Sequence, residues 1–187
     1  MGGSFYSDAI YHDRVTKHRK AGTDIFAHSA AIKSGSKPKN IHDSLNPSIP
    51  NSLGVKIREV LDSDNYPESN LAIIIGDTTG SMGRVPRIIM DNLPKLRGAL
   101  INKGYLPQAQ LMVGAVNDAV WSQFPIQISQ AENGNEIDEH ISNIFIEGGG
   151  GSDYHESYDL MFYYLNKSII RKLLSKLTSY VTFFTCQ

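Results

Sequence analysis

One short run of residues most restricts what this chain can fold into. Residues 71–75 (LAIII) are all apolar, and Ser69-Asn70 before them and Gly76-Asp77 after them bound the run. A continuous apolar run of this length indicates a strand buried on both faces, because a strand with one wet face alternates apolar and polar residues. The run therefore predicts the central strand of a mostly parallel sheet that helices cover on both faces.

The pattern after this strand alternates between helix and strand. Apolar residues at helical spacing predict a helix over residues 85–103, which Pro94 should kink or split. Further apolar runs predict strands over residues 110–116 and 124–128, and Pro125 places the second of these at a sheet edge. The remaining predicted elements are a helix over 136–146, a helix over about 155–177 and a last strand over 179–185. This alternation predicts an α/β fold.

The chain divides into a polar N-terminal extension, residues 1–55, and a body, residues 56–187. Residues 1–60 carry nine Lys and Arg against five Asp and Glu, whereas the remainder carries nine against fourteen. The extension shows little apolar periodicity, and its segments KSGSKPK (33–39) and NPSIP (46–50) are typical of loops or linkers. It also holds four of the six histidines, but their spacing matches no compact metal-ligand pattern. We expect an arm that packs on the body or pairs with another surface.

Charge and cysteine content exclude several classes of function. The formal net charge of −1 argues against a nucleic-acid or membrane-surface binder held by bulk electrostatics. The single cysteine, Cys186, excludes an intrachain disulfide and a thiolate metal cage. The longest apolar run is far too short to span a bilayer. We therefore expect a cytoplasmic protein with no nucleic-acid or membrane partner.

The residues that directly follow the central strand carry the clearest chemical signal. Asp77, Thr79 and Ser81 place one carboxylate and two hydroxyls on alternate positions of a tight turn. Mg²⁺ prefers oxygen ligands of this kind and keeps several waters. The alternative interpretation is structural: Asp77 ends the strand and Ser81 caps the next helix. Spacing alone leaves both interpretations open.

Residues 74–83 (IIGDTTGSMG) resemble the metal-ion-dependent adhesion site, MIDAS, of von Willebrand factor A (vWA) domains. The motif of that family is Asp-x-Ser-x-Ser after a central strand, and Thr79 stands here in its middle position. The resemblance covers about residues 56–187 and implies a Rossmann-like α/β fold with a divalent ion, usually Mg²⁺. In such domains a partner's carboxylate completes the ion's coordination, and most members are binding or assembly modules rather than enzymes. It implies Asp77, Thr79 and Ser81 as ligands.

Two further segments fit this resemblance in part. Family members supply another ligand from a glycine-rich loop before a later helix, and Gly148 to Gly151 followed by Ser152 and Asp153 occupies that place. Ser152 or Asp153 would be the ligand, although a flexible linker with Asp153 capping the next helix is the alternative. Asp118, after the second strand, would orient a ligand or a water, and its alternative role is that of a turn aspartate.

The chain departs from the family near its last strand. Family members usually carry an Asp after the fourth strand, whereas residues 180–187 read YVTFFTCQ, with Cys186 at the expected place of the acid. The two strand-helix units that normally follow are also missing, so the domain appears C-terminally short. The last strand should then be an exposed sheet edge, which the N-terminal extension or a second copy of the chain could cover.

Other assignments fail on the same residues. Residues 76–81 lack the lysine and the spacing of a P-loop. A dinucleotide-binding fingerprint would place its glycines directly after the first strand, whereas the glycine run of this chain follows a predicted helix.

Two alternatives to a vWA-like binding module stay open. One is a metal-dependent hydrolase or phosphoryl-transfer domain, for which the sequence shows no evident base or nucleophile. The other is a self-assembling structural subunit with a vestigial metal site.

Overall fold

The computed structural model describes residues 7–48, 69–82, 84–93, 96, 99–100, 103–106, 108–148, 157–168 and 180–184. A helical N-terminal segment comes first, and from residue 70 onward the described chain contains both helices and strands. In chain order the elements are α1 (Asp8–Ala21), α2 (Ala27–Lys33), the 3₁₀ turn η1 (Asp43–Leu45), β1 (Asn70–Asp77), the 3₁₀ turn η2 (Gly80–Met82), α3 (Val85–Asp91), β2 (Ala109–Val116), β3 (Ile126–Ile128), α5 (Glu136–Ser142), α6 (Tyr158–Ser168) and β4 (Tyr180–Phe184).

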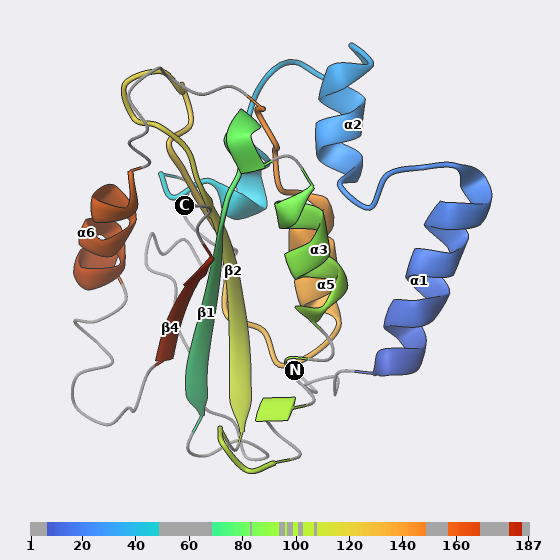
Figure 1. The fold of residues 1–187 in the computed structure, drawn as a ribbon, viewed down its shortest axis with the longest axis vertical. Coiled ribbons are helices and arrows are strands. Elements are labelled where there is room, and N and C mark those ends of the chain that lie inside the picture. Colours follow the sequence, from blue (N-terminus) through green and yellow to red (C-terminus); the bar gives the residue numbers. More distant parts are fainter. Residues whose placement is uncertain are drawn as a thin grey trace.

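The described strands form one sheet in the order β3-β2-β1-β4, with β1 inside it (Figure 1). β1 runs parallel to β2, from Asn70 opposite Ala109 to Asp77 opposite Val116, and parallel to β4. β3 runs antiparallel to β2 and lies at an edge. The prediction of a central parallel strand is confirmed, and so is the edge position that Pro125 suggested.

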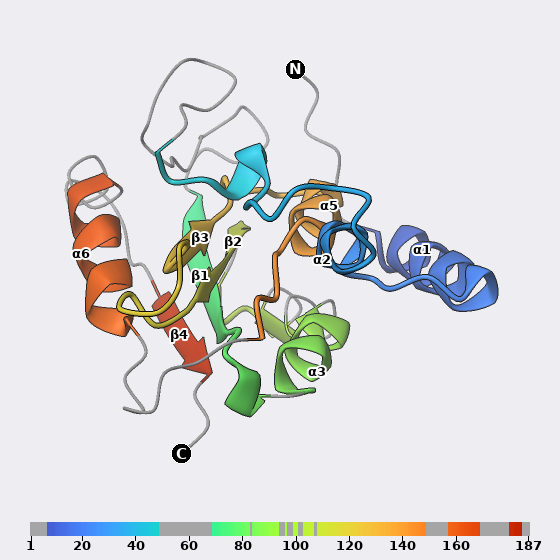
Figure 2. The same ribbon diagram turned by 90° about the horizontal axis from the view of Figure 1, so that it is seen from above.

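Apolar side chains fill both faces of this sheet. Ala72 and Ile74 of β1 belong to one buried cluster, which α5 and α3 cover, whereas Ile73 and Ile75 belong to a second cluster with Met161 of α6. Seen from above, α6 lies on one side of the sheet and α3 and α5 lie on the other (Figure 2). Because every residue from Leu71 to Asp77 is buried, β1 has no wet face. The protein is therefore a mixed α/β fold with a small, mostly parallel sheet.

The N-terminal segment contains two helices that the sequence pattern did not predict. α1 begins after Ser7, whose hydroxyl accepts a hydrogen bond from the Ile10 amide, and it ends at Gly22, which has a φ of 63°. Glycine adopts this left-handed conformation without a steric penalty. Phe26 and Leu45 are 2% and 0% exposed and pack in the same cluster as β1 and β2. The segment thus contributes to the core of the sheet.

The predicted helix over residues 136–146 is shorter in the structure. α5 ends at Ser142, and the amide of Phe145 donates to Gln127 Oε1 at 2.9 Å. The Gln127 side chain also donates through Nε2 to the carbonyl of Phe145 at 2.8 Å. These two bonds hold Phe145 against β3, so the backbone leaves the helix. Within the described part of the chain, no helix is long and apolar enough to cross a membrane.

Candidate functional site at the carboxyl edge of the sheet

The polar residues that follow β1 and β2 lie at one edge of the sheet. Asp77, the last residue of β1, pairs with Val116, the last residue of β2. The Val116 carbonyl accepts hydrogen bonds from the amide and the hydroxyl of Thr78, at 3.0 and 3.2 Å. We call this region, formed by residues 77–80, 117–122, 147–148 and 157, the carboxyl edge. Ligands of open α/β sheets bind at such edges.

Asp77 is buried with one carboxylate oxygen unused. Asp77 is only 2% exposed, and its Oδ1 accepts a hydrogen bond from the Thr79 amide at 2.7 Å. Oδ2 has no hydrogen-bond partner among the described residues. Oδ2 is not one of the fully buried side-chain atoms that lack a hydrogen-bond partner, so a water or an ion can reach it. A carboxylate oxygen of this kind is a ligand that Mg²⁺ prefers. Asp77 is therefore placed as a metal ligand would be.

The structure describes the side chain of Thr79 but not that of Ser81. Thr79 is 6% exposed and follows the end of β1 by two residues. Ser81 lies in η2, and its side chain is outside the described part of the structure. α3 begins only at Val85, so Ser81 is not the residue that precedes this helix. The alternative role of Ser81 as the cap of the next helix does not fit this placement.

Asp118 repeats the arrangement of Asp77 at the end of the neighbouring strand. It is 6% exposed, and its Oδ1 accepts a hydrogen bond from the Val120 amide at 2.7 Å. This bond forms a local turn of the aspartate type, which was the alternative role for Asp118. Its Oδ2 has no partner in the described ranges, so the same residue can also orient a ligand or a water.

Ser152 and Asp153 lie outside the described residues, but both flanks of their segment reach the carboxyl edge. The Gly148 amide donates to the Thr78 carbonyl at 3.4 Å. On the other side, the Ser157 amide donates to the Asn117 carbonyl at 3.2 Å, and its hydroxyl accepts from the Ala119 amide at 2.8 Å. Gly148 and Ser157, the described residues on either side of this segment, therefore both lie at the carboxyl edge.

Gly80 allows the motif turn to touch the start of the glycine run. A Cβ atom added at Gly80 would lie 2.8 Å from the carbonyl oxygen of Gly148, closer than real Cβ atoms approach such an atom. A side chain at this position would push the two segments apart. The glycine thus serves a close approach of two backbones at the carboxyl edge.

A pocket of about 290 Å³ opens at this edge. It is lined by Lys39, Asn117, Asp118, Trp121, Ser122, Glu147 and Gly148. The Glu147 carboxylate pairs with Lys39 Nζ at 2.5 Å and accepts a hydrogen bond from the Ser122 hydroxyl. Trp121, the only tryptophan of the chain, is 63% exposed.

Glu147, Trp121 and Lys39 are among the lining residues that the sequence analysis did not single out. Glu147 directly precedes the glycine run, and an acid next to a predicted ligand loop was a usable signal. Trp121 follows the end of a predicted strand by five residues, and a large aromatic in such a loop does not serve the core of the sheet. Lys39 gave no signal, because it lies in a polar loop more than a hundred residues from Glu147.

A hard cation at the carboxyl edge would need hydroxyl and water ligands in addition to carboxylates. Among the described residues, no group of three or more His, Cys, Asp or Glu side chains is placed to hold a metal ion. A site built on Asp77 would need the oxygens of Thr79, Ser81 and the segment after Gly148.

No protein-family model, curated protein or solved structure matches this chain.

Proposed function

We propose that this chain is a metal-dependent protein-binding or assembly module of the vWA type, with a Rossmann-like fold. The observation that carries the proposal is the buried Asp77, with its free Oδ2, at the carboxyl end of the central parallel strand. The proposed Mg²⁺ ligands are Asp77, Thr79, Ser81 and either Ser152 or Asp153, with Asp118 orienting a ligand or a water.

The low charge of this site supports a role in binding a partner. Asp77 is the one carboxylate of the Asp-Thr-Ser turn, so few negative charges offset the dehydration of Mg²⁺. The ion should bind weakly by itself and keep coordination positions for water. A carboxylate from a partner protein can then replace a water and strengthen the binding.

Exposed apolar side chains beside the site also favour a protein partner. Val120 and Trp121 are 80% and 63% exposed and follow Asp118 by two and three residues. Tryptophan is enriched among the residues that contribute most to protein-protein affinity. A partner that reaches the ion at the carboxyl edge would also cover these two side chains.

A catalytic role has less support. His140, one of two histidines in the body, hydrogen bonds to Glu132 at 3.1 Å. Glu132 bridges to Leu111, near the amino-terminal end of β2, whereas Asp77 and Asp118 lie at the carboxyl edge. His140 is therefore not placed to act as a base for a water bound at Asp77.

Self-association is a second candidate function, and the position of β4 favours it. β4 is at the end of the strand order and pairs with β1 alone among the described strands. A strand in this position can pair with an added strand from another chain. In this case a second copy of the chain would be the partner.

The proposed site is tested by calorimetric titration of the protein with Mg²⁺. Asp77→Asn keeps an oxygen that can accept the Thr79 amide but removes the charge, so the turn is retained and the ion loses its main ligand. We expect weak Mg²⁺ binding by the unchanged protein and no detectable binding by Asp77→Asn. Asp13→Asn, at an exposed carboxylate of α1, is the matched control and should bind as the unchanged protein does. Undiminished binding by Asp77→Asn would refute the site.

A further inference from the structure

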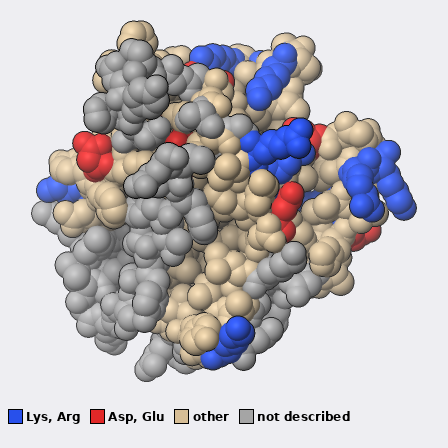
Figure 3. Space-filling view, viewed as in Figure 1, with Lys and Arg blue, Asp and Glu red and all other residues tan. Residues whose placement is uncertain are grey.

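A larger cavity lies between the N-terminal segment and α3, apart from the carboxyl edge. It has a volume of about 880 Å³ and shares no lining residue with the pocket at that edge. Its lining residues are Asp24, Phe26, Ser29, Ala30, Lys33, Ser34, Arg84, Arg87 and Ile146. Basic side chains gather over α2 and α3 on this face of the molecule (Figure 3). Nothing in the proposed metal site uses this cavity.

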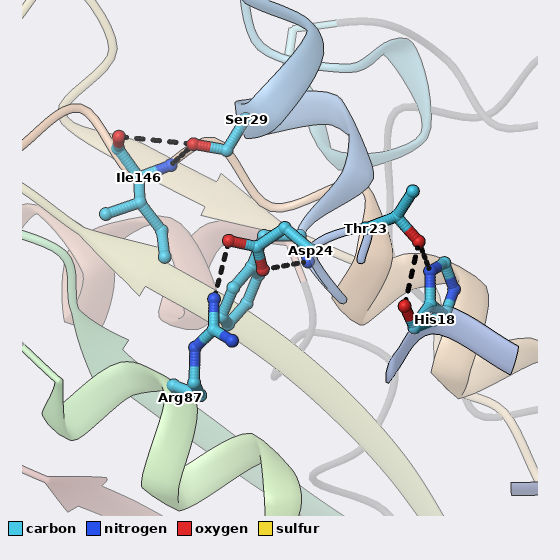
Figure 4. A network of polar contacts seen from close by, with 7 residues as sticks. His18, Thr23, Asp24, Ser29, Arg87 and Ile146 are labelled. Carbon is cyan, nitrogen blue, oxygen red and sulfur yellow. Dashed lines mark hydrogen bonds and ion pairs between the residues drawn. The ribbon is translucent and has the colours of Figure 1, made fainter. Parts of the chain in front are cut away.

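The cavity has an excess of positive charge. Three basic side chains and one carboxylate line it, so its formal charge is +2. The carboxylate, Asp24, is already satisfied: Oδ2 pairs with Arg87 Nη2 at 2.5 Å and Oδ1 accepts from the Phe26 amide at 3.0 Å (Figure 4). Lys33 and Arg84 are exposed and have no ion-pair partner within the described ranges.

One more carboxylate acts on Arg87 from outside the cavity. Asp91 lies one helical turn after Arg87 on α3 and does not line the cavity. Burial raises the pKa of Asp91, and Arg87 opposes this rise. Arg87 is therefore paired with Asp24 and also lies within the influence of the Asp91 charge, so it serves mainly to fix the cavity wall. Lys33 and Arg84 remain as the groups that can bind an incoming anion.

The walls around these charges are apolar and held in place. Phe26 is 2% exposed, and Ala30 and Ile146 complete an apolar part of the lining. The Ser29 hydroxyl donates to the Ile146 carbonyl at 3.3 Å and accepts from the Ile146 amide at 3.2 Å (Figure 4). This pair of bonds joins α2 to the segment after α5, so the cavity is formed before any ligand arrives.

We propose that this cavity binds a phosphate-bearing small molecule of about the size of a mononucleotide. The volume lies within the range of about 300–1,000 Å³ that is typical of small-molecule sites. An arginine guanidinium matches the oxygens of a phosphate with two parallel hydrogen bonds, and a lysine adds a mobile point charge. Arg84 and Lys33 bind the phosphate, and the remainder of the ligand lies along Phe26, Ala30 and Ile146.

The test is calorimetric titration of the full chain with adenosine monophosphate, pyrophosphate and adenosine. EDTA is present throughout, so that a metal at the carboxyl edge cannot bind the phosphate and the result is independent of the proposed function. We expect saturable binding of the two anions, weaker at higher salt, and much weaker binding of uncharged adenosine. The double substitution Lys33→Ala/Arg84→Ala should weaken binding of both anions by about tenfold or more, because each lost charged hydrogen bond has a large effect.

The matched control is Arg19→Ala/Lys20→Ala. It removes the same two residue types from the exposed end of α1, outside the cavity lining. Affinity for both anions should stay within about twofold of that of the unchanged protein, since distant surface charges are screened by salt. All four positions are exposed, so both variants should keep the circular dichroism spectrum of the unchanged protein. Two results would overturn the proposal: no saturable binding of either anion, or an equal loss of affinity in the control.

Discussion

Replacing Phe26 with alanine should lower the free energy of unfolding by about 3–5 kcal/mol, the range for large-to-small changes of buried aromatics. The ring is 2% exposed and packs in the cluster that contains Ile74 of β1 and Leu111 of β2. Its removal therefore leaves a cavity between the N-terminal segment and the sheet. Urea unfolding followed by circular dichroism gives the value directly.

Ile10→Ala provides the control for this prediction. Ile10 lies in the same segment but is 51% exposed, so its truncation should change the free energy of unfolding by no more than about 0.5 kcal/mol. Leu45→Ala, at a residue that is 0% exposed, should behave like Phe26→Ala, with a loss of about 2–5 kcal/mol. Small effects for both Phe26 and Leu45 would mean that the segment does not belong to the core in solution.

Deleting residues 1–54 should have an even larger effect. The deletion removes Phe26 and Leu45 together and uncovers the apolar cluster on one face of β1 and β2. It also removes seven of the chain's 18 Lys and Arg residues, so any charge attraction between the N-terminal segment and the acidic body is lost. We expect aggregation or a changed oligomer by light scattering, and a lower melting temperature. A monomer of unchanged thermal stability would contradict this prediction.

The two central strands could be predicted from sequence because each contains a long apolar run. Residues 71–75 and 110–116 lie within β1 and β2, and a buried parallel strand has no polar face that could hide this pattern. The short edge strand was recognised from Pro125 next to an apolar stretch. These signals are local in the sequence, so they can be recognised without knowledge of the tertiary structure.

The N-terminal segment could not be predicted in the same way. Its buried large apolar side chains, which among the described residues are Tyr11, Phe26, Ile41 and Leu45, are scattered along the chain and form no sustained helical or strand periodicity. α1 is polar around most of its surface, and Tyr11 is its one buried residue among those described. α1 contacts the start of α5, where Ser7 exchanges hydrogen bonds with Asn135, and the sequence does not display such long-range contacts.

The same distinction applies to the carboxyl edge. Asp77 and Asp118 were recognised because each directly follows a predicted strand, and both lie buried at that edge. The pair of Lys39 and Glu147 joins the N-terminal segment to the residue before the glycine run. An ion pair between residues so far apart depends on how the whole chain folds, so it could be found only in the structure.

The position of a bound ion tests the proposed metal site most directly. Mn²⁺ prefers the same oxygen ligands as Mg²⁺ and gives an anomalous X-ray signal. In a crystal soaked with Mn²⁺, we expect an anomalous peak about 2–2.3 Å from a carboxylate oxygen of Asp77, close to the hydroxyls of Thr79 and Ser81. A peak at another place, or no peak at saturating Mn²⁺ with the carboxyl edge open to solvent, would contradict the proposed site.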